Sequence, residues 1–322
     1  MNNNHLPPKI ICISLFQFWA LNVTRGMRIA MNKNRYTGLF YLTPWLIGIC
    51  FFVIYPFIMS LYYSFTDYSL LDEPAFIGLD NYSRMFTSDS TFWISVKATI
   101  KFVFFTVPLK LTFALLIAYI MNAKLKGIGF FRTAYYIPSI LGANVAIAVL
   151  WQFLFKSDGL INMALNMIGL ESIGWFSSAS GAMFTIVLLR IWQFGSAMVI
   201  FLNALSEIPQ ELYEAASIDG ASKFRQFFSV TIPQLTPIIF FNLILQLVQA
   251  FQEFEGPFLV TGGGPMKSTY LLPMYIYDSA FKNFEMGYSG ALSWVLFIMI
   301  MIFTAILFKT SSKWVFYADG GK

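Results

Sequence analysis

Long apolar runs separated by short polar segments dominate this chain. Six of these runs contain about 20 mostly apolar residues, the length that a helix needs to cross the hydrocarbon core of a bilayer. The expected spans are residues 39–65, 93–121, 133–155, 181–205, 233–253 and 286–309. The pattern therefore predicts an all-α fold, a polytopic membrane bundle of about six transmembrane helices.

The remaining segments are short. We expect an N-terminal cytoplasmic or interfacial segment (1–38), a transmembrane domain (39–310) and a cytoplasmic tail (311–322). Residues 10–23 form a further apolar run that is short for a span and lacks a small-residue cleavage site, so a signal peptide is not indicated. A helix at the membrane surface and an additional span both remain open for this run.

Composition agrees with a membrane protein, because apolar residues make up 57% of the chain and charged residues 11%. Soluble domains contain about 25% charged residues. His5 is the only histidine, and Cys12 and Cys50 both lie in apolar stretches. Neither a disulfide framework, nor a metal site, nor catalysis by histidine is indicated.

Basic residues are distributed unevenly between the two sides of the expected spans. Segments 1–38, 122–132, 206–232 and 310–322 carry twelve Lys and Arg residues, whereas the intervening loops carry four. Cytoplasmic loops are enriched in Lys and Arg. We therefore expect both termini and the loop around Glu214 to lie in the cytoplasm.

The loop between the fourth and fifth spans predicts a short helix. Ser206 can cap its start, Pro209 is tolerated in its first turn, and Gly220 can end it in a left-handed conformation. Ala215 and Ala216 are small, so a partner surface could approach closely. An ordinary amphipathic connector is the alternative for this segment.

The order and spacing of this loop resemble the EAA loop of ABC-importer permeases. The resemblance covers Glu214-Ala215-Ala216, Asp219-Gly220-Ala221, Phe227 and Pro233, with Ile232 where the family usually has Leu. In that family the loop forms a cytoplasmic coupling helix that docks on a separate ATPase subunit. The resemblance therefore assigns ATPase coupling to Glu214, Ala215, Ala216, Asp219, Gly220, Phe227 and Pro233.

Four further stretches resemble the carbohydrate-uptake, maltose-type branch of these permeases. They are Phe131–Pro138, Trp151, Gly159–Asn162 and Thr261–Pro265. The glycines of the last stretch precede Lys267 and Ser268, but a phosphate-binding P-loop needs Gly directly before Lys, and Met266 stands there. We interpret this stretch as a tight loop between spans.

The resemblance implies a permease subunit that moves a carbohydrate from a solute-binding protein across a bacterial inner membrane into the cytoplasm. It also implies a second, homologous permease chain, in a heterodimer, and two cytoplasmic ATPase subunits. ATP and magnesium would be bound by the ATPases, so we expect no cofactor and no enzymatic activity on this chain. The lipid bilayer is a further expected partner, and nucleic acid is not expected to bind.

Polar side chains form a stripe in the fifth span. Asn242, Gln246, Gln249 and Glu253 fall within an arc of about 60° on a helix, and such residues usually face a bundle interior or an aqueous cavity. They can hydrogen-bond sugar hydroxyls, so we predict that they line the substrate pathway. Contacts that hold helices together are the alternative.

Two cations are expected deep in the bilayer, Lys110 in the second span and Arg190 in the fourth. The spans offer few acids to neutralise them, because Glu253 is expected near the outer end of its helix. We therefore also assign Lys110 and Arg190 to the pathway, where they would favour an anionic oligosaccharide or a sugar phosphate. Pairing with backbone carbonyls and amides is equally open.

Two other functional classes remain as alternatives. An ion-coupled secondary transporter would explain charged residues within the membrane but not the loop around Glu214. An intramembrane enzyme would need a constellation of histidine, metal ligands or an activated nucleophile, and we find none in the sequence.

Overall fold

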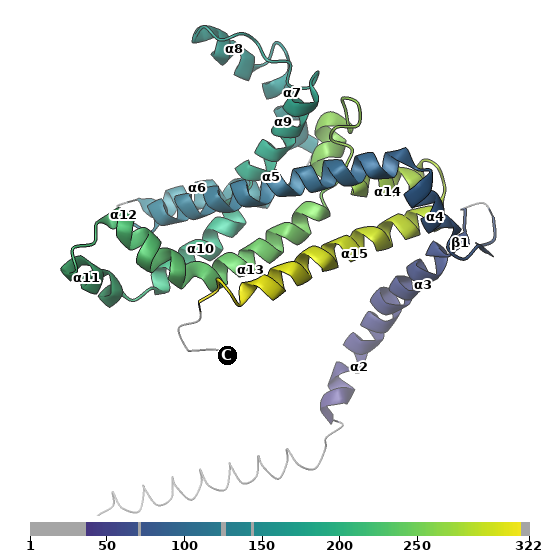
Figure 1. Ribbon diagram of the computed structural model, residues 1–322, viewed down its shortest axis with the longest axis horizontal. Coiled ribbons are helices and arrows are strands. Elements are labelled where there is room, and N and C mark those ends of the chain that lie inside the picture. Colours follow the sequence, from purple (N-terminus) through teal and green to yellow (C-terminus); the bar gives the residue numbers. More distant parts are fainter. Residues whose placement is uncertain (1–36, 70–71, 124–126, 143–144, 317–322) are drawn as a thin grey trace, which may run out of the picture. The chain divides into compact units, whose positions relative to one another are not determined.

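The computed structural model describes residues 37–69, 72–123, 127–142 and 145–316 (Figure 1). The apolar run 10–23 lies outside the described residues. The described chain is almost entirely helical, which confirms the all-α prediction. It divides into two compact units, one up to Ser60 and one from Leu61 onward.

The first unit is a single apolar helical run. It contains α2 (Thr37–Ile49), the π-helical turn η1 (Cys50–Ile54) and the first part of α3 (Tyr55–Ser64). Large apolar side chains such as Phe52 are exposed along it, as suits a helix surrounded by lipid. The π-helical turn stands just ahead of Pro56, whose missing N–H interrupts the regular hydrogen-bond ladder.

The second unit begins with a small antiparallel sheet and a short helix. Strands β1 (Thr66–Asp67) and β2 (Ala75–Phe76) pair with Thr66 opposite Phe76, and α4 (Asp80–Thr87) follows. The buried Asn81 amide donates to the carbonyls of Ser64 and Thr66 at 3.0 and 2.9 Å. One side chain thus fixes the start of α4 against the end of α3.

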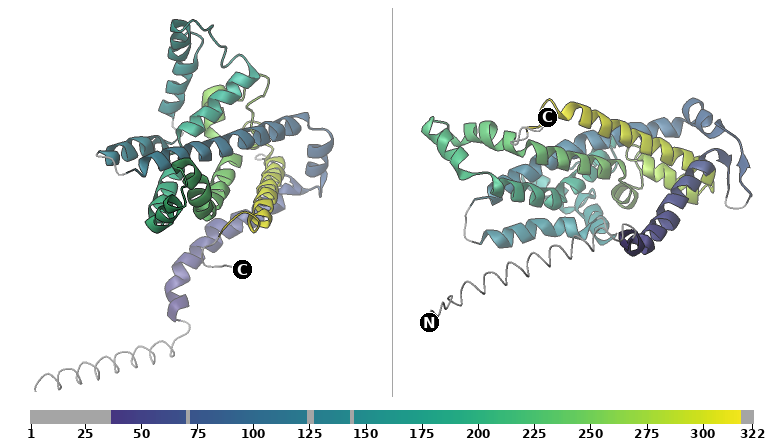
Figure 2. Two further views of the ribbon diagram at one scale, coloured as in Figure 1. Left: turned by 60° about the vertical axis from the view of Figure 1, so that its left-hand side comes forward. Right: turned by 90° about the horizontal axis from the view of Figure 1, so that it is seen from below.

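Helix α5 (Ser90–Met121) is the central element of this unit, with 32 residues. It packs against α9, α10 and α13, and it lies beside α13 in the views of Figures 1 and 2. Its buried face is apolar over most of its length. The largest fully buried side chains of the unit include Phe92, Phe102, Ile186, Phe201 and Phe251.

The third expected span is not one helix. The pattern predicts a run over 133–155, but α6 (Ile128–Leu141) ends before Gly142, and α7 (Val145–Phe155) and α8 (Leu160–Met167) follow separately. Gly142 has a φ of +61°, which only glycine adopts without strain. A continuous apolar pattern concealed this interruption.

The fourth expected span is also divided. Helices α9 (Ala179–Trp192) and α10 (Gly195–Glu207) meet at an angle of 43°. A Cβ atom on Gly195 would lie 2.7 Å from the backbone oxygen of Tyr135 in α6. The missing side chain of Gly195 therefore allows α10 to pack closely against α6.

The loop that contains Glu214 forms α11 (Gln210–Ile218), and a helical run follows it. That run comprises α12 (Lys223–Gln226), the π-helical turn η2 (Phe227–Thr231) and α13 (Ile232–Phe251). The predicted capping role of Ser206 is wrong. Ser206 still belongs to α10, where its hydroxyl donates to the carbonyl of Asn203, and Pro209 occupies the cap position of α11.

The chain ends with the π-helical turn η3 (Pro257–Thr261), α14 (Leu272–Phe281) and α15 (Met286–Ser311). After α15 the chain returns to α13, where the Phe316 N–H donates to the Thr236 hydroxyl at 2.8 Å. Within the described residues, four helical runs are long and apolar enough to cross a membrane. The number rises to six if each of the two bent pairs, α6 with α7–α8 and α9 with α10, counts as one span.

Candidate transport cavity and coupling segment

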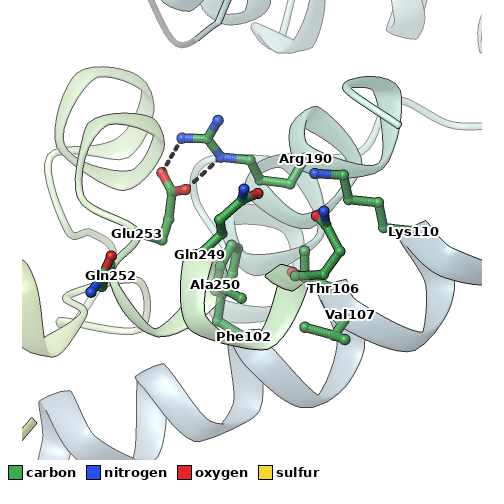
Figure 3. A pocket seen from close by; sticks show the side chains of 10 residues that line it. Phe102, Thr106, Val107, Lys110, Arg190, Gln249, Ala250, Gln252 and Glu253 are labelled. Atoms are coloured by element: carbon green, nitrogen blue, oxygen red, sulfur yellow. Dashed lines mark hydrogen bonds and ion pairs between the residues drawn. The ribbon is translucent and has the colours of Figure 1, made fainter. Parts of the chain in front are cut away.

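A polar cavity of about 300 Å³ lies between α5, α9 and α13 (Figure 3). The long helices supply its walls, and the two residues that follow the last turn of α13 close one side. Its lining consists of Phe102, Thr106, Val107, Lys110, Arg190, Gln246, Gln249, Ala250, Gln252 and Glu253. Five of the six residues that the sequence assigned to the pathway therefore meet at one place.

Arg190 is neutralised within the chain. Its Nε lies 2.5 Å from one oxygen of Glu253, and its Nη2 donates to the other oxygen at 2.5 Å. Its Nη1 donates to the Gln193 side-chain oxygen at 2.6 Å. The expectation that no deep acid would pair with Arg190 is wrong, because the chain leaves the helix after Phe251 and turns Glu253 inward.

Glu253 and Gln193 are themselves held by backbone groups. The Gly256 N–H donates to Glu253 Oε1 at 2.9 Å, and the Gln193 amide donates to the carbonyl of Gly142 at 2.9 Å. Both side chains are buried. The ion pair is therefore part of a network that ties α9 to the end of α13 and to the break after α6.

Lys110 differs from Arg190. Its side chain is only 7% exposed, yet it makes no hydrogen bond or ion pair with the described part of the chain. In Figure 3 its ammonium group projects into the cavity, whereas the Arg190 guanidinium is directed at Glu253. The cavity thus contains two cations and one anion, with Lys110 as the unneutralised charge.

The stripe in α13 is present but only partly faces the cavity. Gln246 and Gln249 line it, whereas Asn242 is fully buried away from the lining, and neither polar atom of its amide has a hydrogen-bond partner among the described residues. The pathway role assigned to Asn242 therefore has no support from the cavity geometry.

Sequence reasoning predicted Lys110 but missed five members of the lining, which are Phe102, Thr106 and Val107 on α5, Ala250 on α13 and Gln252 after α13. Phe102, Thr106 and Lys110 recur every four residues and so share one helix face, a signal that the sequence contains. Gln252 could not be found this way, because it follows the end of the regular helix.

The coupling segment is a helix–turn–helix made by α11 and α12. Gly220 has a φ of +76° and ends α11 in the expected left-handed conformation. The Tyr213 hydroxyl lies 2.9 Å from the Thr231 hydroxyl, and the Gln226 amide donates to the Ser217 hydroxyl at 2.8 Å. The first contact fixes α11 against η2, and the second fixes it against α12.

The residues assigned to coupling fall into two groups. Glu214, Ala215, Asp219 and Gly220 are exposed, and Ala216 is half-buried. Phe227 is half-buried in η2, where its ring meets the ring of Tyr119 of α5 edge-on at 4.8 Å, and Pro233 lies in the first turn of α13. The first group is available to a partner, and the second anchors the segment to the bundle.

The sequence profile of the binding-protein-dependent transport system inner membrane component family matches residues 96–315. The chain belongs to this family. The matched region contains the coupling segment and every residue that lines the cavity. A permease component of this kind carries solute across the inner membrane and performs no chemistry on it.

Two curated permeases and one solved structure are similar to the chain. The probable ABC transporter permease YesP of Bacillus subtilis is 44% identical, over 89% of this chain and 94% of its own. The trehalose/maltose transport system permease MalF of Thermococcus litoralis is 33% identical, over 84% and 92%. A bacterial ABC transporter involved in the import of the acidic polysaccharide alginate shares the fold at a TM-score of 0.77, with 20% identity over 89% of this chain and 99% of that one.

Proposed function

We propose that this permease moves a carbohydrate through the cavity between α5, α9 and α13, driven by ATPase subunits that dock on α11. The observation that carries the proposal is the set of cavity amides. The side-chain amides of Gln246, Gln249 and Gln252 make no hydrogen bond with the described part of the chain, so their donors and acceptors are free. Sugars present many hydroxyls, which both donate and accept.

The similarity to a permease of a trehalose/maltose system supports a carbohydrate substrate. The binding-protein-dependent family supports ATP-driven import over ion-coupled transport, for which the comparisons give no support. In the proposed assembly a second, homologous permease completes a heterodimer, two ATPase subunits bind ATP and magnesium in the cytoplasm, and a solute-binding protein delivers the sugar from outside.

The exposed surface of α11 supports the docking role. The side chain of Glu214 makes no hydrogen bond or ion pair within the described chain, and Glu214 lies one position before the small Ala215. The segment is polar. The loops on its side of the membrane carry most of the Lys and Arg residues, which favours a cytoplasmic location for this side. Movement of α11 would pass through Tyr213 and Thr231 to η2 and α13, and so to the cavity wall.

The test begins with co-purification of the chain from native membranes and identification of the chains that accompany it. The complex is then placed in proteoliposomes with its binding protein, and uptake of a panel of labelled neutral and acidic disaccharides is measured with ATP inside. We expect sugar uptake that requires ATP and falls in a Gln246→Leu, Gln249→Leu variant. Uptake without ATP that follows an ion gradient, or no uptake of any sugar, would contradict the proposal.

A further inference from the structure

Two neighbouring groups on α5 combine burial with the absence of a partner. Lys110 and Thr106 are 7% and 4% exposed, and both line the cavity. They stand four residues apart and therefore share one face of the helix. Neither the Lys110 ammonium nor the Thr106 hydroxyl has a hydrogen-bond partner in the described chain.

In the part of the chain that the structure describes, Thr106 shares a buried hydroxyl without a partner with one other threonine, Thr304 of α15, which does not line the cavity. Buried threonines in helices usually donate to a carbonyl one turn earlier. Thr99 does so to Ser95 at 2.8 Å, and Thr185 does so to Ala182 at 2.8 Å. Thr106 makes no such bond, and a buried polar group without a partner destabilises a protein. A ligand that supplied the missing acceptor would remove this cost.

The cavity also has an excess of one positive charge. Glu253 pairs with Arg190 through both carboxylate oxygens, so these two side chains neutralise one another. Lys110 is then left with an uncompensated charge in a site with few water contacts. Charges in such a site interact much more strongly than in bulk water. One negative charge on a ligand would make the cavity neutral.

We propose that Lys110 and Thr106 form a subsite for a single carboxylate on the transported sugar, so that the substrate is an acidic carbohydrate containing a uronic acid. The inference rests on the proposed function and assigns its substrate class. A carboxylate matches the excess of one charge, whereas a phosphate with two charges would leave the cavity negative. Its oxygens can accept from the ammonium and from the hydroxyl together. Arg190 is not part of this subsite, because Glu253 already occupies its guanidinium.

The experiment compares pairs of disaccharides that differ only in the carboxylate. Galacturonosyl-galactose and digalactose form one pair, and glucuronosyl-glucose and diglucose of the same linkage form the second, so each acidic member carries a single carboxylate. The whole complex with its binding protein is placed in proteoliposomes, and the ratio of acidic to neutral uptake is measured. We expect the unaltered complex to prefer an acidic member.

Lys110→Met should lower the ratio of acidic to neutral uptake by about tenfold or more, because a hydrogen bond to a charged group contributes about 1.5–3 kcal/mol. Thr106→Val keeps the shape and should lower the ratio by about fivefold. Lys110→Arg keeps the charge and should restore much of the ratio. Lys101→Met is the matched control, because Lys101 is an exposed lysine on the same helix outside the lining.

The other possible outcomes separate a failure of the uronate subsite from a failure of the proposed function. Uptake of neutral sugars alone would overturn the uronate subsite and leave the carbohydrate permease in place, whereas uptake of no sugar would contradict the proposed function itself. An equal loss of both members in Lys110→Met and in Thr106→Val would overturn the uronate subsite and support a structural role for the two side chains. If Lys110→Met does not assemble, the ratio for Thr106→Val decides, and an unchanged ratio in that variant would overturn the subsite.

Discussion

Arg190 and Glu253 form a buried ion pair whose stability depends on both members. Arg190 contacts Glu253 through two nitrogens, and the Gly256 N–H adds a third bond to the carboxylate. Removing one member of a buried pair leaves the other charge without compensation, which typically destabilises a protein by about 3–5 kcal/mol. Removing both leaves no unpaired charge.

We therefore predict that Arg190→Met and Glu253→Gln each lower the thermal unfolding temperature of the purified complex, and that the double variant recovers much of the loss. Differential scanning calorimetry or fluorimetry in detergent measures this. If the double variant loses as much stability as the two single variants together, the pair does not act as a unit.

Asp89 is a second residue whose charge organises several helices. One oxygen accepts from the N–H groups of Thr91 and Phe92 at 2.8 and 3.1 Å, which caps α5, and the other accepts from the hydroxyls of Tyr275 and Tyr288. Burial raises the pKa of Asp89, but these hydrogen bonds outweigh it, and its pKa lies below the ordinary value. The carboxylate form is therefore favoured by folding.

A depressed pKa means that Asp89 stabilises the fold above the unfolded pKa of about 3.9, and that this contribution disappears as the pH falls through the folded pKa. We predict that Asp89→Asn, which can still cap α5, is less stable than the unaltered protein at pH 7 and that the difference shrinks toward pH 3. Unfolding temperatures across this range provide the measurement. Two parallel pH curves would refute a stabilising charge at this position.

The sequence located single residues of the site better than it located their partners. The depth of Lys110 and Arg190 follows from counting residues along apolar runs. The pairing of Arg190 with Glu253 joins positions 63 residues apart and depends on how the chain turns after Phe251, where helical periodicity ends. The burial of Asn242 away from the cavity could not be predicted either, because periodicity gives a face of the helix but not the neighbour that covers it.

At the scale of elements, helix boundaries in this chain follow glycine and proline. Gly220 ends α11 as predicted, because its φ of +76° suits a residue without a side chain. The π-helical turn η2 ends two residues before Pro233, and η1 stands in the same relation to Pro56. A proline in an apolar pattern was recognisable from sequence, but the widened turn ahead of it was not.

The coupling segment contains two residues whose substitution should uncouple ATP hydrolysis from the loaded binding protein. Glu214 is exposed and unpaired within the described chain, so Glu214→Lys should leave folding intact and abolish the stimulation of ATP hydrolysis by the loaded binding protein. Gly220→Pro should have the same effect through the turn, because proline cannot adopt a positive φ. The readout is phosphate release by the reconstituted complex.

Glu207→Lys is the matched control, since it makes the same charge reversal at an exposed position at the end of α10, outside α11. It should leave stimulated hydrolysis close to normal. Equal losses in Glu207→Lys and Glu214→Lys would point to general electrostatics of this side of the membrane, and normal stimulation in Glu214→Lys and Gly220→Pro would remove the coupling role.

At the scale of the whole molecule, the number of membrane crossings decides which surface meets which partner. The apolar pattern predicts six spans, and the structure has four unbroken runs and two bent pairs. Three candidate crossings separate Ser88 from Ser217: α5, the pair α6 with α7, and the pair α9 with α10. An odd number of crossings puts the two residues on opposite sides.

We predict that a cysteine at Ser217 reacts with a membrane-impermeant maleimide only from the cytoplasm, and that cysteines at Ser88 and Ser157 react only from outside, in a protein without Cys12 and Cys50. All three positions are exposed. The twelve-to-four distribution of Lys and Arg supports this orientation. Ser157 reports on the bent pair α6 with α7, and Ser217 reports on the bent pair α9 with α10. Cytoplasmic reaction at Ser157 would mean that α6 and α7 enter and leave on one side, and external reaction at Ser217 with Ser157 also outside would mean the same for α9 and α10. Either outcome would move α11 or the cavity to the wrong side for an ATPase-driven permease.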